Sequence, residues 1–295
     1  MTGPGGKDSP KPASQTSYMP MKTSKHFIIT CALIIPVAVA AMSAPVPAAP
    51  VSGLAFEPQE PPPPQDKRKE VKELCDTFGD HIKAKGKEDQ LAVAVLDKLL
   101  KEFEGSGPKD RASIAKAIDK AFDQSRREIE EGIPNNQLNL AAAVALGDMG
   151  PESAKLLAKR IGHKKLKDDD AVRRRLILSL GRTKDESGLK TLQDLLVHRR
   201  PILQGAAAEA LGEYVKLKLK KRKDVFEDIL KALDSAKAAV DADVTDPIAR
   251  DRYDTVSAPM MTSLARLCGE RVNSPEEWRR WWNKNKKADW DAGDD

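Results

Sequence analysis

Four histidines and three cysteines are the most reactive side chains in this 295-residue chain. No two histidines have the i, i+4 spacing of a helical metal site, and none stands beside a cysteine. The histidines are His26, His81, His163 and His198. Cys75 and Cys268 stand near opposite ends of the repetitive part of the chain, where repeats contact only their neighbours. We therefore expect free thiols and no metal site.

Clustered carboxylates are the other candidate chemistry. Asp168–Asp170 and the group Glu128, Glu130 and Glu131 have the composition of a Ca²⁺ site or an acid–base pair. Asp168–Asp170 precedes a helical pattern, however, where carboxylates cap a helix and interact favourably with its dipole. The sequence also lacks a glycine-rich phosphate loop, a Gly-x-Ser-x-Gly motif and a zinc-protease motif. We predict that the chain is not an enzyme and holds no cofactor.

Basic residues recur in four groups, at residues 163–167, 173–175, 198–200 and 216–223. Aligned along one ridge, they would bind an acidic protein, an acidic cell-envelope polymer or nucleic-acid phosphates. Acidic residues alternate with them, which is typical of solvated helix faces. The candidate partner-binding residues are Arg173, Arg174, Arg175, Arg199, Arg200, Lys218, Lys220, Lys221 and Arg222.

The net charge does not favour nucleic acid. It is formally +5, but the first 43 residues hold four lysines against one aspartate, which leaves +2 for the rest of the chain. A body this close to neutral has no global electrostatic reason to bind nucleic acid. We therefore expect a protein partner.

The composition predicts that helices position these residues. Aromatic residues make up only 4% of the chain and charged residues 32%, which disfavours a β-sandwich or barrel. From Asp66 onward apolar residues keep helical spacing, and short turns with Gly, Pro or Asp separate the stretches. Three such stretches, at 71–78, 91–103 and 114–122, predict helix pairs in residues 67–133.

A helix pair repeats in residues 134–290. Its first helix ends at Leu146-Gly147, Leu180-Gly181 and Leu211-Gly212, where the leucines are 34 and 31 residues apart, and a fourth copy ends near Ser263-Leu264. One helix pair cannot bury its apolar faces alone, so this period predicts stacked pairs. We expect the glycines to allow a close turn or a left-handed residue at the helix end.

The repeat resembles the HEAT-repeat family, which has an armadillo-like topology. Asp170-x-Val172-Arg173 opens one copy, its first helix ends at Leu180-Gly181, and its turn holds Asp185. The resemblance is best over residues 135–235 and implies a right-handed α-solenoid of stacked antiparallel helix pairs. The arginine of the family is replaced in the other copies, by Asn139, Gln204 and Ser257, so a continuous Asp–Arg ladder is not expected.

All four tryptophans stand near the end of the chain. Ser274-Pro275-Glu276-Glu277 is a strong helix start, with a serine cap, a proline in the first turn and a capping box. Trp278, Trp281 and Trp282 follow on one face, an ending similar to the closing helix of exported bacterial HEAT-repeat proteins. We interpret them as a structural cap over the last repeat, and an aromatic ligand platform is the alternative.

The segments before the helices have a different character. Residues 1–20 are rich in Gly, Pro, Ser and Lys and are expected to be a disordered leader. Residues 21–43 have the charged start, the short apolar run and the small residues of a signal peptide, and an uncleaved membrane anchor is the alternative. Residues 44–66 are proline-rich and predict an extended linker. A disordered tail is expected at 291–295.

These observations predict an all-α, monomeric, exported protein that is periplasmic or tethered to a membrane. Its predicted role is that of a non-enzymatic scaffold for protein–protein interaction, because extended solenoid surfaces suit protein partners. Two alternatives stay open. One is a binder of an acidic cell-envelope polymer or nucleic acid through a basic ridge, and the other is a HEAT enzyme of the lyase or glycosylase kind.

Overall fold

The computed structural model describes residues 64, 66–124, 126 and 128–292. The leader expected at 1–20, the signal segment expected at 21–43 and most of the linker expected at 44–66 lie outside this range. The described residues form eleven α-helices and short 3₁₀ turns and contain no strand, only an isolated bridge between Glu130 and Ile133. Within the same range, no helix combines the length and the hydropathy needed to cross a bilayer.

The predicted all-α architecture of stacked helix pairs is confirmed. The helices are α1 (Lys69–Lys83), α2 (Asp89–Glu104), α3 (Pro108–Asp119), α4 (Gln137–Asp148), α5 (Ala154–Ile161), α6 (Asp170–Thr183), α7 (Leu189–Leu195), α8 (Pro201–Leu211), α9 (Leu219–Ala242), α10 (Pro247–Cys268) and α11 (Pro275–Asn285).

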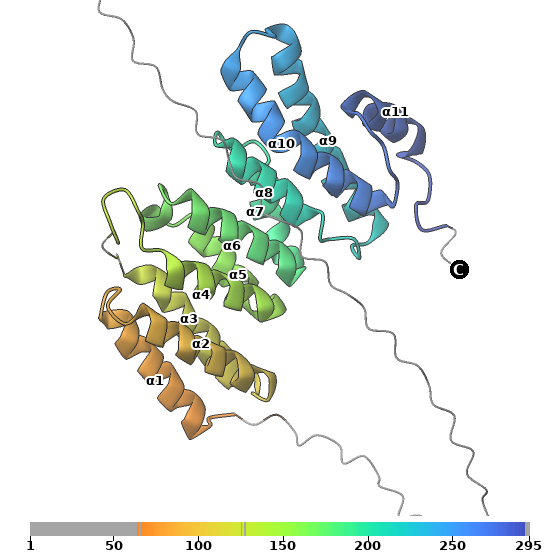
Figure 1. Cartoon of the computed structure of the whole chain (residues 1–295). Coiled ribbons are helices and arrows are strands. Elements are labelled where there is room, and N and C mark those ends of the chain that lie inside the picture. Colours follow the sequence, from red (N-terminus) through yellow and green to blue (C-terminus); the bar gives the residue numbers. More distant parts are fainter. Residues whose placement is uncertain (1–63, 65, 125, 127, 293–295) are drawn as a thin grey trace, which may run out of the picture. The chain divides into compact units, whose positions relative to one another are not determined.

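The helices form two layers, which Figure 1 shows as a continuous stack from α1 to α11. The even-numbered helices pack side by side in the order α2, α4, α6, α8 and α10. Each odd-numbered helix packs on an even-numbered neighbour or, for α11, on α9. Successive helices reverse direction, so each layer buries its apolar stripe against the other.

The glycines at the ends of the even-numbered helices serve a different purpose from the one expected. Gly147, Gly181 and Gly212 do not have positive φ angles, so the expected left-handed conformation is wrong. A Cβ at Gly181 would lie 2.7 Å from Cα and Cβ of Ala210 on the neighbouring helix. A Cβ at Gly147 or Gly212 would likewise approach a serine of the next even-numbered helix within 3 Å. The glycines therefore let successive even-numbered helices touch.

Helices α9 and α10 are much longer than α8 and form a projecting hairpin (Figure 1). Gln204, in the first turn of α8, accepts a hydrogen bond from Arg252, which lies in the second turn of α10. The first turn of α10 therefore extends past the start of α8. Pro259 lies inside α10, and Gly205 of α8 leaves space for its ring, since a Cβ there would meet Pro259 Cγ at 3.3 Å.

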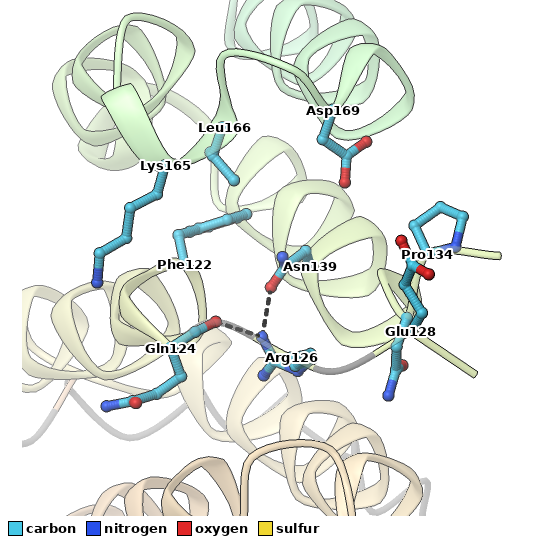
Figure 2. Close-up of a pocket in the computed structure, with 10 residues that line it drawn as sticks. Phe122, Gln124, Arg126, Glu128, Pro134, Asn139, Lys165, Leu166 and Asp169 are labelled. Carbon is cyan, nitrogen blue, oxygen red and sulfur yellow. Dashed lines mark hydrogen bonds between the residues drawn. The ribbon is translucent and has the colours of Figure 1, made fainter. Parts of the chain in front are cut away.

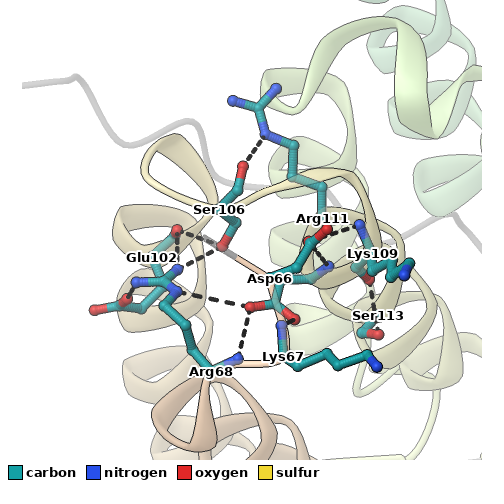
Figure 3. A network of polar contacts seen from close by, with 9 residues as sticks. Asp66, Lys67, Arg68, Glu102, Ser106, Lys109, Arg111 and Ser113 are labelled. Atoms are coloured by element: carbon teal, nitrogen blue, oxygen red, sulfur yellow. Dashed lines mark hydrogen bonds and ion pairs between the residues drawn. The ribbon is translucent and has the colours of Figure 1, made fainter. Parts of the chain in front are cut away.

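The first helix, α1, precedes the first complete pair and is joined to it by reciprocal caps (Figure 3). Asp66 accepts hydrogen bonds from the backbone N–H groups of Lys109 and Asp110 at the start of α3. Asp110 accepts in return from the N–H groups of Lys67 and Arg68 at the start of α1. Asp66, expected at the end of the linker, therefore belongs to the folded stack.

The tryptophans at the other end surround one phenylalanine. The Phe226 ring of α9 lies 5.2–5.8 Å, between centroids, from all four indoles. Trp278 is fully buried and Trp282 is buried, whereas Trp281 and Trp290 are half-buried. Asp291, the first residue of the tail expected at 291–295, forms an ion pair with Arg222 of α9.

We expect Gly181→Ala to destabilise the stack by about 1–3 kcal/mol, because its Cβ would press on the backbone of Ala210. Gly79→Ala is the matched control. Gly79 lies inside α1 with no atom within 4 Å of a built Cβ, so alanine should stabilise by about 0.5–1 kcal/mol through helix propensity. Chemical denaturation of the two variants tests this, and equal effects would contradict the close helix contact.

The loss of stability on replacing each tryptophan by alanine should increase with the burial of its indole. We expect Trp278→Ala and Trp282→Ala to cost about 3–5 kcal/mol each and Trp281→Ala clearly less. Thermal melts with iodide quenching of tryptophan fluorescence measure both effects. Unchanged melting with freely quenched fluorescence would instead support the ligand platform.

Candidate interaction edge

The loops that lead into the even-numbered helices all lie at one end of the helix pairs, because successive helices reverse direction. We call this end the Arg199 edge, formed by residues 84–88, 120–124, 126, 128–136, 162–169, 196–200 and 243–246 with the first turns of the helices that follow them. The opposite end, the Lys218 edge, is formed by residues 105–107, 149–153, 184–188, 212–218 and 269–274 with the helix starts that follow them.

Exposed aliphatic side chains concentrate on the Arg199 edge. Eight large hydrophobic residues of the described range are exposed, and seven of them lie there. The seven are Leu91, Ile129, Ile133, Val197, Ile202, Val244 and Ile248. Val215, the eighth, lies on the Lys218 edge and is the least exposed at 37%. Exposed apolar residues scattered singly are ordinary, but concentration on one edge marks a candidate contact surface.

The aliphatic residues near α8 and α10 form the part of this edge that is best defined by contacts. Arg252 donates hydrogen bonds to the backbone carbonyls of His198 and Arg199, which fixes the 196–200 loop against α10. Ile248 lies one helical turn before Arg252, so both occupy the same face of α10. Val197 is 80% exposed and Ile248 is 76% exposed.

The nine candidate partner-binding residues do not form one ridge. Arg173, Arg174 and Arg175 on α6 belong to the Arg199 side. Arg199 and Arg200, in the loop between α7 and α8, lie on the same side. The remaining four, Lys218, Lys220, Lys221 and Arg222, lie at the opposite end of the helix pairs. This separation was not predicted from the sequence, because the opposite directions of successive helices were not taken into account.

Several of these residues are already engaged. Arg222 is only 8% exposed and donates to the carbonyl of Val215 as well as pairing with Asp291, so it is structural. Lys221 pairs with Glu186, and Arg174 with Glu209. Lys218, Lys220, Arg175 and Arg199 are exposed.

Arg200 holds the acidic residues of the preceding loop. Its guanidinium pairs with Asp170 at 2.5 Å and with Asp168 at 3.3 Å. Asp169 caps α6 by accepting from Val172 N–H at 2.9 Å. The Asp168–Asp170 cluster therefore serves the helix start and an inter-repeat ion pair, as the capping interpretation expects.

A polar cavity of about 240 Å³ lies between the α3–α4 loop and residues 165–169 (Figure 2). Arg126 is one of its lining residues, pairs with Asp89 at 2.6 Å and donates to Asn139 and two backbone carbonyls. Glu128 accepts from Gly132 N–H in its own loop. These contacts fix the α3–α4 loop and assign no acid–base pair.

The histidines and cysteines are dispersed. His81 contacts Glu88, His163 caps Lys165 N–H, and His198 contacts Arg173. Cys75 and Cys268 are free and half-buried, and burial raises the pKa of each thiol, for Cys268 to about 11. In the described ranges, no three His, Cys, Asp or Glu residues are grouped as metal ligands.

Arg252 and Ile248 are the edge residues that sequence reasoning missed. Ile248 is exposed and Arg252 is half-buried, and the positions of both depend on the extension of α10 beyond α8. One sequence signal was available: Asp246-Pro247 marks a helix start, and Ile248 in the first turn has no apolar partner one turn later, since position 252 is arginine.

Comparison with known families agrees with this geometry. Residues 163–242 match the family model of HEAT repeats, a segment that runs from the α5–α6 loop to the end of α9. Neither the curated proteins nor the solved structures contain a match to this chain. HEAT repeats generally mediate protein–protein interaction. The repeat match and the two-layered stack together show that residues 163–242 are built as HEAT repeats.

Proposed function

We propose that this chain is an exported, non-enzymatic HEAT-repeat scaffold that binds another protein along its Arg199 edge. The observation that carries the proposal is the concentration of exposed aliphatic side chains on that edge, seven of eight in the described range. A bound partner that covers Val197 and Ile248 removes apolar surface from water, which contributes about 25 cal/mol per Å² buried.

The edge suits a protein partner because it mixes apolar and charged side chains. Interfaces between proteins combine an apolar centre with a polar rim. At the Arg199 edge, Val197 and Ile202 flank the basic loop 198–200, and Val244 stands beside the acidic residues Asp243 and Asp246.

A polymer binder is less well supported. Binding of a nucleic acid or an acidic polymer gains from a long row of cations along the phosphate or carboxylate backbone. The two basic sets of this chain lie on opposite edges, and Asp168, Asp170 and Glu186 pair with their members. A HEAT enzyme is likewise less well supported, because the cavity around Arg126 is built from structural contacts.

Export is a separate element of the proposal and rests on the sequence of residues 21–43. We expect the mature chain to begin near Ala41 or Ala44, because the charged start, the short apolar run and the small residues follow in the order that a signal peptide requires. N-terminal sequencing of the native protein tests this. An intact segment 27–42 in the soluble fraction would refute it.

Site-specific crosslinking in intact cells tests the edge. A photoreactive amino acid at position 248 should crosslink to a discrete protein, whereas the same residue at position 215, on the opposite edge, should not. Val197→Asp should reduce the crosslink from position 248 by about tenfold or more, because a carboxylate in an apolar contact costs on the order of 1.4 kcal/mol or more.

Val215→Asp is the matched control and should leave that crosslink unchanged. Equal crosslinking from positions 248 and 215, or a crosslink that Val197→Asp does not weaken, would reject the Arg199 edge as the binding surface.

A further inference from the structure

The loop at residues 196–200 is surrounded by arginines that lack acidic partners. Arg173 donates to the carbonyls of Ile161 and Lys167 and contacts His198 Nε2 at 3.4 Å. Arg252 donates to the carbonyls of His198 and Arg199 and to Gln204. Arg199 is exposed. None of these three guanidinium groups forms an ion pair with a described residue.

Half-buried and buried arginines elsewhere in the described stack are paired with carboxylates. Arg126 pairs with Asp89, Arg160 with Asp119 and Asp123, and Arg68 with Glu102 and Asp110. Arg173, Arg199, Arg200 and Arg252 together form the 196–200 cluster. The acidic residues that contact it are Asp168 and Asp170, and both pair with Arg200. Four arginines against two aspartates leave this cluster with two uncompensated positive charges.

Burial and neighbouring charges both act on the titratable groups of this cluster. Burial lowers the pKa of the Arg173 guanidinium, and the charges of Arg200 and Arg199 lower it further against the opposing effect of Asp170. Burial and the charge of Arg173 also lower the pKa of His198 below its ordinary value. Burial is the main cause of both shifts, and the charges of the neighbouring arginines add to it.

We propose that Arg173, Arg199 and Arg252 form the docking site for an acidic peptide segment of the partner protein, whose carboxylates pair with these guanidinium groups while an apolar side chain rests on Val197 and Ile248. This inference rests on the proposed function and names the chemistry of the partner. Arginine suits the role because its planar fork binds carboxylates in bidentate geometry.

The neighbouring aliphatic residues favour a peptide over a polyanion. A nucleic acid or an acidic polysaccharide has no aliphatic side chain to cover Val197 and Ile248, which are 80% and 76% exposed. The unpaired arginines are also confined to one loop, so they match a short acidic segment. An alternation of acidic and aliphatic residues is the simplest segment that satisfies both features.

Fluorescence anisotropy with the full chain tests the site. The probe is a labelled ten-residue peptide of alternating glutamate and leucine. We expect it to bind more tightly than the matched glutamate–serine peptide, and we expect a lysine–leucine peptide not to bind. Arg173→Gln and Arg199→Gln should each weaken binding of the glutamate–leucine peptide by about tenfold, since each removes charge-assisted hydrogen bonds.

Arg271→Gln is the control, because Arg271 is exposed in the α10–α11 loop on the Lys218 edge and loses the same charge. It should change the affinity by less than about twofold. Arg173 also donates hydrogen bonds to backbone carbonyls, so Arg173→Gln can fail to fold for structural reasons alone. In that case the affinity of Arg199→Gln decides the test.

Three results would overturn the proposal: no binding of the glutamate–leucine peptide, unchanged affinity in Arg199→Gln, or tighter binding of a ten-residue oligothymidine than of the peptide. The last would assign the cluster to a polyanion. A crosslink from position 248 that persists in any of these cases leaves the proposed protein-binding edge standing and removes only the acidic peptide.

Discussion

The stack depends on close contact between successive even-numbered helices, because no helix pair of this chain can bury its apolar flanks alone. Gly147, Gly181 and Gly212 set the distance of that contact, since each faces a small residue of the next even-numbered helix. Stacking still leaves the outermost helix at each end of the stack without a neighbouring pair. The chain covers one end with α1 and its aspartate caps, and the other with indoles around Phe226.

A second constraint applies to the arginines that lie between repeats. A buried guanidinium without a carboxylate is costly, and the arginines between repeats meet that requirement through ion pairs such as Arg160–Asp119 and Arg126–Asp89. The Arg199 edge departs from the rule at the place where aliphatic side chains are also exposed. Two independent departures from an ordinary solvated surface therefore coincide at one loop, whereas Val215 on the opposite edge stands alone.

The helical period and the leucine spacing were sufficient to predict the fold, because both follow from local pattern. The role of the glycines was not predictable from one sequence, since the contact of Gly181 with Ala210 is a distance between helices. The separation of the basic groups was available in principle: residues 198–200 precede an even-numbered helix, and residues 216–223 follow the same helix. For Ile248 the sequence shows only a first-turn residue without an apolar partner one turn later, because its exposure depends on how far α10 extends past α8.

Arg173 and Arg252 show how one residue can support the stack and still be available to a partner. Ile161 is the last residue of α5, and its carbonyl has no acceptor role inside the helix, so the Arg173 guanidinium satisfies a carbonyl that the helix end leaves free. Arg252 does the same for the carbonyls that follow α7. Carbonyls satisfy the hydrogen-bonding requirement of an arginine but leave its charge uncompensated. The contact between repeats therefore uses N–H groups of Arg173 and Arg252 as hydrogen-bond donors. Their positive charge stays available to a carboxylate of a partner.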